Sequence, residues 1–267
     1  MQPQMAKTTR VSTWDRPGWG LSDGAEGKHT IATSTAALEA ALATGKIGGP
    51  YVLVGHSLGG LEALLYADRH REQVAAMVLV DPSVPDQGAL TERIAPALAA
   101  ERVRLSPATP FRTCASDIRN GLARPGGPDP HSCFQFPPFF PPELSAALAP
   151  KVSNPIQYDT MASFIENVDE SSRVAINSAR NYGDMPLVVL TATARGALPP
   201  DTPPEAVQQF ATYQEAFGRA HGDLAALSTR GRQVRVPGSD HYMQRSTPQV
   251  VIDTVDSVVS EARAGGR

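Results

Sequence analysis

The sequence predicts an α/β fold, in which a mostly parallel sheet is flanked by helices and a helical segment is inserted between two strands. Short apolar runs without polar alternation, typical of parallel strands covered on both faces, recur along the chain. Helical patterns separate these runs, and this alternation indicates parallel βαβ units. Strand signals are lacking in residues 86–183, which are rich in proline and aromatic residues. We therefore expect a core of residues 1–85 and 184–267 and a helical cap, or lid, of residues 86–183.

Each element of the predicted core has its own signal. The expected strands are residues 11–14, 51–54, 75–80, 187–190 and 233–236, and the expected helices are residues 33–43, 58–70, 205–227 and 248–262. The first strand is β-branched and aromatic and ends in the turn sequence Asp-Arg-Pro-Gly. The first helix stops at Gly45, and the second places Leu61, Leu64 and Leu65 on one face.

Length, composition and charge limit the possible functions. A chain of 267 residues suits one α/β domain with an insertion, and 41% hydrophobic with 19% charged residues allows a sizeable core. The formal net charge of −3 leaves no polycationic surface for a phosphate backbone, so nucleic acid is not an expected partner. The oligomeric state cannot be inferred from the sequence.

No stretch of the sequence predicts a membrane span or a secretory signal. The longest apolar runs fall far short of the ~20 residues that a membrane helix needs. The N-terminal sequence MQPQMAKTTR lacks the apolar stretch of a signal peptide. We expect a cytoplasmic protein as the chain is written, and a periplasmic or secreted one if an upstream signal peptide is missing.

A candidate nucleophile lies where a predicted strand meets a predicted helix. Residues 55–60 read Gly-His-Ser-Leu-Gly-Gly and fit the pattern G-x-S-x-G in the strand-turn-helix setting that it requires. We expect Ser57 to be exposed at the edge of the sheet in a strained turn. The Leu58 N–H, at the start of the helix, is the candidate donor to a developing oxyanion. A serine that only caps the helix is the alternative.

A serine nucleophile needs a base, and a histidine late in the chain is the candidate. His241 follows the strand 233–236 through a Pro-Gly-Ser-Asp loop and precedes the final helix. His56 adjoins the serine, but consecutive side chains in a turn should diverge. The other four histidines are expected to be surface or packing residues.

Two aspartates are candidates for the acid that orients the histidine. Asp81 ends the strand 75–80, so its carboxylate should project at the same edge of the sheet as Ser57. After the strand 187–190, no carboxylate occurs before Asp201. This placement favours Asp81, with Asp201 as the alternative. A structural role as a turn cap is also open to Asp81, because Asp-Pro often opens a turn.

On these residues the chain resembles the α/β-hydrolase superfamily, in the branch with a helical cap, over most of residues 11–262. Residues 14–22 are similar to the D-R-x-G-x-G-x-S stretch of such enzymes, and residues 241–244 look like the family's histidine loop. The chain order of serine, acid and histidine is also the family's. Certain haloalkane dehalogenases of this superfamily place the acid at the position of Asp81, but they use an aspartate nucleophile where this chain has Ser57.

The resemblance implies a serine hydrolase that cleaves a small to medium apolar carboxylic ester, or a similar acyl bond, through an acyl-enzyme. Its expected partner is a small-molecule ester-like substrate. No cofactor and no metal site are expected, because the sequence contains no Rossmann, P-loop or metal-spaced motif. In the cap, Phe136, Phe139 and Phe140 are candidates for contacts to substrate, and packing within the cap is their alternative role.

The chain departs from the family at its start. Members begin with three strands before the region of Asp15, and the third is followed by a His-Gly loop that supplies a second oxyanion donor. Only ten residues precede Val11, so we expect an N-terminally incomplete α/β-hydrolase fold without that loop. The alternative function is therefore a catalytically impaired or non-catalytic binding protein that keeps the pocket.

The two cysteines leave two states open. Cys114 and Cys133 lie 19 residues apart in the cap and are either free thiols or one disulfide. Free thiols are expected in the cytosol, and a disulfide that tethers the cap is expected in an oxidising compartment.

Overall fold

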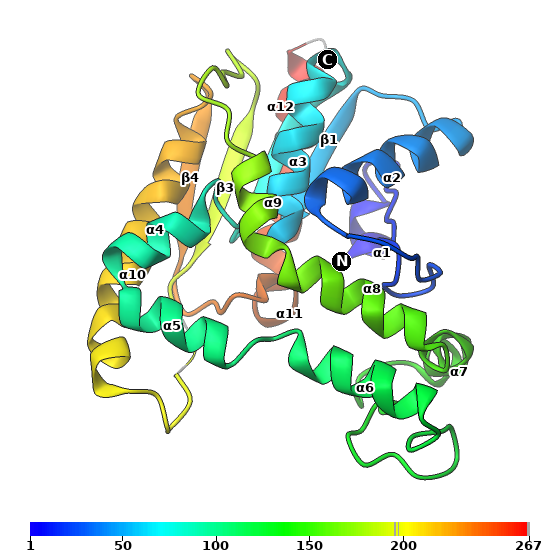
Figure 1. Cartoon of the computed structure of the whole chain (residues 1–267). Helices are drawn as coiled ribbons and strands as arrows, with labels where there is room; N and C mark the ends of the chain where they lie inside the picture. Colours follow the sequence, from blue (N-terminus) through cyan, green and yellow to red (C-terminus); the bar gives the residue numbers. More distant parts are fainter. Residues whose placement is uncertain (195, 197, 266–267) are drawn as a thin grey trace. The chain divides into compact units, whose positions relative to one another are not determined.

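The computed structural model describes residues 1–194, 196 and 198–265 (Figure 1). The chain forms two compact units. The first contains residues 1–12, residues 42–101 and the chain from residue 169 to the end of the described part, and the second contains residues 13–41 and 102–168. The first unit thus includes the two ends of the segment predicted as the cap. The division into core and cap stays a prediction.

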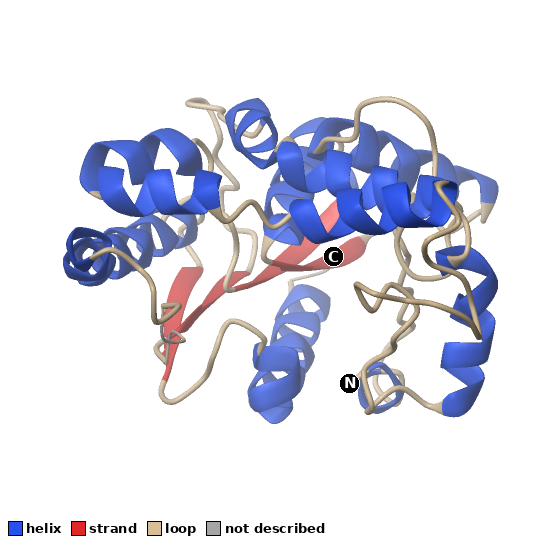
Figure 2. Cartoon of the chain, turned by 60° about the horizontal axis from the view of Figure 1, so that its bottom comes forward, coloured by secondary structure: helices blue, strands red, loops and turns tan. Residues whose placement is uncertain are grey.

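The first unit is built on a four-stranded parallel sheet (Figure 2). In spatial order, which is also chain order, the strands are β1 (Tyr51–His56), β2 (Val74–Val80), β3 (Leu187–Ala192) and β4 (Gly231–Val236). In the register, Val78 of β2 lies between Val54 of β1 and Val188 of β3. An α/β fold with a parallel sheet is thereby confirmed, as are four of the five predicted strands.

Helices make up most of the rest of the chain. They are α1 (Gln2–Met5), α2 (Ile31–Thr44), α3 (Leu58–Arg69), the 3-10 helix η1 (Arg71–Gln73), α4 (Gln87–Ile94), α5 (Pro96–Arg104), α6 (Thr109–Arg119), α7 (Pro142–Val152), α8 (Pro155–Glu166), α9 (Val168–Val174), α10 (Pro204–Ala225), α11 (Met243–Ser246) and α12 (Pro248–Ala264). The four core helices predicted from the sequence are α2, α3, α10 and α12, and residues 86–183 are helical without a strand. Within the described residues, none of these helices has the length and apolar character needed to cross a bilayer.

Burial of the two central strands explains their apolar sequences. Every residue of β2 and β3 is buried. On one face, Val251 and Val255 of α12 pack in the same cluster as Val78 and Leu190. Helix α3 contacts β1 and β2, and α10 contacts β3 and β4. Figure 1 shows α3 in front of the strands and α12 behind them, which is the double cover expected of continuous apolar strands.

The strand predicted at residues 11–14 is wrong. This segment carries no strand assignment, and the ladders in the described part of the chain connect only β1 to β4. Its β-branched and aromatic residues favour extended backbone, but a strand also needs a neighbour that accepts and donates its main-chain hydrogen bonds. The boundary between the two compact units passes through this segment, after Ser12.

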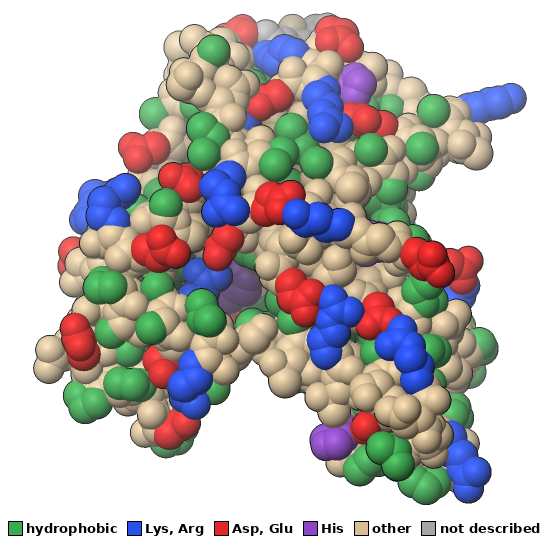
Figure 3. Space-filling view, in the orientation of Figure 1, with side chains coloured by type: hydrophobic (Ala, Val, Ile, Leu, Met, Phe, Trp, Pro, Cys, Tyr) green, Lys and Arg blue, Asp and Glu red, His purple; other side chains and the backbone are tan. Residues whose placement is uncertain are grey.

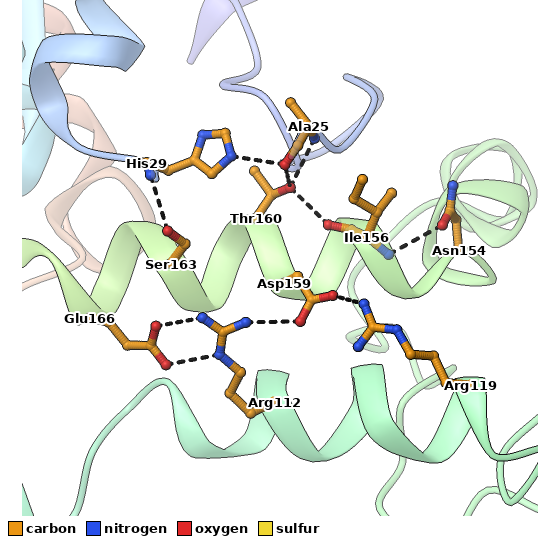
Figure 4. Close-up of polar contacts among 10 residues, drawn as sticks. All are labelled: Ala25, His29, Arg112, Arg119, Asn154, Ile156, Asp159, Thr160, Ser163 and Glu166. Carbon is orange, nitrogen blue, oxygen red and sulfur yellow. Dashed lines mark hydrogen bonds and ion pairs between the residues drawn. The ribbon is translucent and has the colours of Figure 1, made fainter. Parts of the chain in front are cut away.

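In the second unit, alternating charges join α6 to α8 (Figure 4). Arg112 Nε donates to Glu166 at 2.9 Å, Arg112 Nη1 donates to Asp159 at 2.8 Å, and Arg119 pairs with the same aspartate. The hydrogen bond from Arg112 holds the pKa of Glu166 below its usual range. Figure 3 shows acidic and basic side chains alternating over these helices. Because the side chains are partly exposed, the pairs set the alignment of the two helices more than they add stability.

The stretch that resembles D-R-x-G-x-G-x-S forms a turn packed on α8 in the same unit. Gly18 has a φ of +76°, and a Cβ atom there would lie 2.5 Å from Thr160 Cβ. The Ala25 N–H donates to Thr160 Oγ1 at 2.9 Å, and the His29 N–H donates to Ser163 Oγ at 3.0 Å (Figure 4). Both the left-handed backbone and the close approach to Thr160 therefore require glycine at position 18.

Cys114 and Cys133 form a disulfide, which resolves the two states that the sequence left open. Their Cα atoms lie 5.5 Å apart, within the usual range for a bridge. The bridge ties α6 to the chain before α7, in a buried cluster that includes Tyr158. The Tyr158 hydroxyl donates to the Cys133 carbonyl, and burial raises the pKa of Tyr158 to about 12.

The double variant Cys114→Ala/Cys133→Ala is expected to lose about 3 kcal/mol of unfolding free energy, because the bridge restricts the unfolded chain. Urea unfolding of oxidised wild type and variant measures the difference. Wild type in reductant is the matched control and should unfold like the variant. The prediction fails if the variant is as stable as oxidised wild type. Two alkylated thiols in protein from its native compartment would contradict the bridge itself.

Candidate active site

Ser57 lies in a strained turn between β1 and α3. Its φ of +54° is in the left-handed region that side chains other than glycine rarely adopt. A Cβ atom at Gly55 would lie 2.3 Å from the Gly59 carbonyl oxygen, and one at Gly60 would lie 2.5 Å from Pro82 Cβ. Glycine at positions 55 and 60 thus allows β1, α3 and the loop after β2 to approach one another closely. This close approach places Ser57 in the tight turn at the end of β1.

Main-chain hydrogen bonds join the Ser57 turn to the end of β2. The Ser57 N–H donates to the Val80 carbonyl at 3.2 Å, and the Ser83 N–H donates to the Ser57 carbonyl at 2.9 Å. Leu58 is the first residue of α3, so its N–H lacks an acceptor within the helix. The predicted role of this N–H as an oxyanion donor stays a prediction.

Three predicted side chains from three loops of the first unit meet in one hydrogen-bonded series. His241 Nδ1 lies 2.6 Å from Asp81 Oδ2, and His241 Nε2 lies 3.1 Å from Ser57 Oγ. An ionised carboxylate only accepts hydrogen bonds, so Nδ1 carries the proton and Nε2 is free to accept one from the serine. The arrangement can remove the hydroxyl proton from Ser57.

The Asp81 carboxylate is fully buried and held in place. Its Oδ1 accepts a hydrogen bond from the Ala192 N–H at 3.0 Å, while the Asp81 N–H donates to the Leu190 carbonyl at 2.8 Å. Asp81 has a φ of +41° and is thus, after Ser57, a second residue with a strained backbone at this edge of the sheet. These bonds leave Oδ2 directed at His241.

A buried histidine binds the main chain of the turn that contains Asp81 and Pro82. His221 of α10 has an exposure of 0%, and its Nε2 donates to the Pro82 carbonyl at 2.8 Å. The Thr191 hydroxyl donates to His221 Nδ1 at 2.9 Å and accepts from Gln233 Nε2 at 2.8 Å. The sequence predicted a surface or packing role for His221, and its helical periodicity gave no sign that it binds the carbonyl next to Asp81.

The His56 side chain contacts His241, while its divergence from the Ser57 side chain stays a prediction. Its Nε2 lies 2.7 Å from the His241 carbonyl oxygen, and the two imidazole rings have centroids 4.6 Å apart. The ring thus meets the loop that follows β4. The alternation of side chains in β1 could not reveal this, since it depends on a segment far along the chain.

The other candidates lie elsewhere. Asp201 is exposed in the chain between β3 and α10, while Asp81 pairs with His241. Phe136, Phe139 and Phe140 lie in the second unit between α6 and α7, and Phe139 is 58% exposed. Their contact with substrate stays a prediction. In the part of the chain that the structure describes, no group of three or more His, Cys, Asp or Glu side chains could hold a metal ion.

Comparisons with known proteins agree with the fold. A model of the alpha/beta hydrolase family matches residues 1–254. An uncharacterized protein of Schizosaccharomyces pombe is 40% identical over 81 residues, which are 30% of this chain and 15% of that protein. Lipase LipV of Mycobacterium tuberculosis is 42% identical over 79 residues, 30% of each protein. These matches span well under two thirds of either relative.

A solved structure extends the likeness to nearly the whole chain. A hydrolase from Pseudomonas aeruginosa, 20% identical in sequence, superposes with a TM-score of 0.52 over 96% of this chain and 82% of its own. At that identity the likeness concerns the fold alone, whereas the family model covers most of the sequence. With its parallel sheet and flanking helices, this chain belongs to the alpha/beta hydrolase family.

Proposed function

We propose that the protein hydrolyses small to medium apolar carboxylic esters through an acyl-enzyme, with Ser57 as nucleophile, His241 as base and Asp81 as acid. The observation that carries this proposal is the continuous series from the Asp81 carboxylate through His241 to Ser57 Oγ, with contacts of 2.6 and 3.1 Å. Both distances lie within the reach of proton transfer. The likeness of 79 residues to Lipase LipV supports the same reaction class.

In the first half-reaction, Ser57 Oγ attacks the carbonyl carbon of the ester while its proton passes to His241 Nε2. The Leu58 N–H donates to the oxyanion that forms. The His241 imidazolium, stabilised by Asp81, then protonates the alcohol oxygen as the carbon–oxygen bond breaks. The alcohol leaves and the acyl group stays on Ser57.

In the second half-reaction, His241 Nε2 accepts a proton from a water molecule that attacks the acyl carbon. The tetrahedral intermediate collapses as His241 returns the proton to Ser57 Oγ, which releases the carboxylic acid. Both halves use the same base. Any change that misplaces His241 should therefore slow acylation and deacylation together.

Substrate contacts and cellular location belong to the same proposal. Phe136, Phe139 and Phe140 are proposed to contact the apolar part of the ester, with the helical segment 86–183 acting as a cap. The disulfide between Cys114 and Cys133 favours an oxidising compartment, because cytosolic thiols are kept reduced.

A binding protein without turnover is the second candidate. Within the described residues, we identify one main-chain oxyanion donor, the Leu58 N–H, whereas enzymes of this family use two. Loss of one donor typically lowers kcat by about 10² to 10³. This alternative predicts that an apolar ester binds but is not cleaved.

Reaction with a fluorophosphonate probe and with p-nitrophenyl esters tests the proposal. We expect the purified protein to gain one phosphonyl group, mapped by peptide mass spectrometry to Ser57, and to release p-nitrophenol from short and medium acyl chains. Heat-denatured protein is the control for nonspecific reaction. Binding of the ester without labelling or turnover would favour the second candidate.

A further inference from the structure

The residue before the nucleophile contacts the main chain of the base. His56 ends β1, and its imidazole reaches the loop that follows β4 rather than solvent alone. Its Nε2 lies 2.7 Å from the His241 carbonyl oxygen. On its other side, Gln244 Nε2 of α11 lies 3.4 Å from His56 Nδ1. The ring therefore spans the turn from residue 241 to residue 244, which carries the base.

The chemistry of these contacts defines the tautomer of His56. A main-chain carbonyl oxygen can only accept, so Nε2 carries the hydrogen and donates it to His241. In the neutral ring, Nδ1 is then an acceptor, and it faces the Gln244 amide nitrogen, which donates. One ring thus satisfies two groups of the same turn, and the N–H that matters for His241 is on Nε2.

The loop before His241 has hydrogen bonds of its own, from the Ala194 N–H to the Ser239 carbonyl at 2.8 Å and from the Gly238 N–H to Thr193 Oγ1 at 3.0 Å. His56 adds a contact to the main chain of His241 itself. The loop from residue 237 to residue 240 is irregular, with Gly238 at a φ of +70°, and the His241 side chain is 39% exposed. Asp81 fixes the ring through Nδ1, while His56 fixes the main chain of the same residue. The distance from Nε2 to Ser57 Oγ is 3.1 Å, near the upper end of the range for proton transfer, so a small displacement would break it.

Ring packing adds to the hydrogen bond. The centroids of His56 and His241 lie 4.6 Å apart at an interplanar angle of 44°, and the Tyr242 ring lies 5.7 Å from His56. Packing alone could be supplied by any flat ring. Donation to the carbonyl needs an N–H at the position of Nε2. Substitutions that keep only the ring or only the N–H can therefore separate packing from hydrogen bonding.

We propose that His56 is a positioning residue for the hydrolytic reaction, whose Nε2–H holds the His241 main chain so that the base stays in reach of Ser57. The inference rests on the proposed function, since the base matters only if Ser57 reacts. His56 itself transfers no proton and touches no reacting atom. Its loss should impair both half-reactions equally, because both use His241.

Two substitutions separate donation from packing. His56→Phe keeps a flat ring and removes the N–H, and His56→Gln removes the ring but carries an amide N–H at about the position of Nε2. We expect His56→Phe to lower kcat and the rate of fluorophosphonate labelling by about tenfold to a hundredfold, the scale of a small misplacement of a catalytic group. KM should stay nearly constant, because acylation and deacylation slow together. His56→Gln should recover most of the rate.

His70→Phe is the matched control, since His70 lies at the far end of α3 and is packed against Tyr66. Its kcat should equal that of wild type. Thermal unfolding of all three variants reports any general loss of structure, and His56→Phe should melt close to wild type. The inference is overturned if His56→Phe keeps the wild-type rate, if His56→Gln is as slow as His56→Phe, or if the loss of rate follows the loss of stability.

Nitrogen NMR of the imidazole rings gives a readout that needs no turnover. We expect His56 as the Nε2–H tautomer, and a change in the His241 ring signals in His56→Phe. An Nδ1–H tautomer at His56, or unchanged His241 signals, would overturn the inference. If wild type neither cleaves esters nor reacts with the probe, the proposed function fails, and the NMR result still decides whether His56 holds His241.

Discussion

Ser57→Ala is expected to abolish ester hydrolysis, with a loss in kcat on the order of 10⁶, because nucleophile and base act as a unit and no acyl-enzyme can form. The variant should fold like wild type, since alanine keeps the Cβ atom that the turn already accommodates at a φ of +54°. Steady-state hydrolysis of p-nitrophenyl esters measures the loss. Mass spectrometry after fluorophosphonate treatment should find no phosphonyl group.

Ser34→Ala is a suitable control for this variant. Ser34 is a buried serine of α2 whose hydroxyl has no hydrogen-bond partner among the described residues. Its removal should leave both stability and activity near wild type. Labelling that persists in Ser57→Ala would show that another residue is the nucleophile and would reject the proposed mechanism.

Asp81→Asn is expected to lower kcat by about 10⁴, the scale seen when the acid of such a series is made neutral. The asparagine oxygen can still accept from the Ala192 N–H, so the fold should survive. The amide nitrogen would then face His241 Nδ1 and donate to it. That forces the proton onto Nε2, where it points at Ser57 and blocks acceptance of the serine proton.

Asp201→Asn is the matched control, because it makes the same chemical change at an exposed aspartate. We expect near-wild-type kcat for it, and circular dichroism should show both variants folded. The opposite pattern, with Asp201→Asn inactive and Asp81→Asn active, would assign the acid to the later loop.

Much of the candidate site could be predicted from local sequence because parallel strands end at one edge of a sheet. The apolar runs of β1 and β2 place Ser57 and Asp81 at neighbouring strand ends, and the register confirms that these strands pair. The glycines around Ser57 predicted the tight turn, because a larger residue would collide with the neighbouring backbone or loop. These features depend on residues near one another in the chain.

The features that sequence reasoning missed depend on distant segments. Residues 11–14 have strand-like side chains but no ladder partner in the described chain, and composition cannot supply one. The direction of the His56 ring depends on a loop about 185 residues later, as the separation of its contact shows. The His221 contact with the Pro82 carbonyl likewise joins positions 139 residues apart.

The main-chain bonds between the Ser57 turn and the end of β2 have a consequence for how this protein can evolve. Val80 and Ser83 hold the nucleophile turn through peptide groups alone, so the spacing of the reacting strands does not depend on which side chains occupy those positions. Substitutions at positions 80 and 83 that keep the course of the main chain can then leave that spacing unchanged. Homologues with this backbone can therefore vary in sequence at both positions and still hold residue 57 at the end of β1.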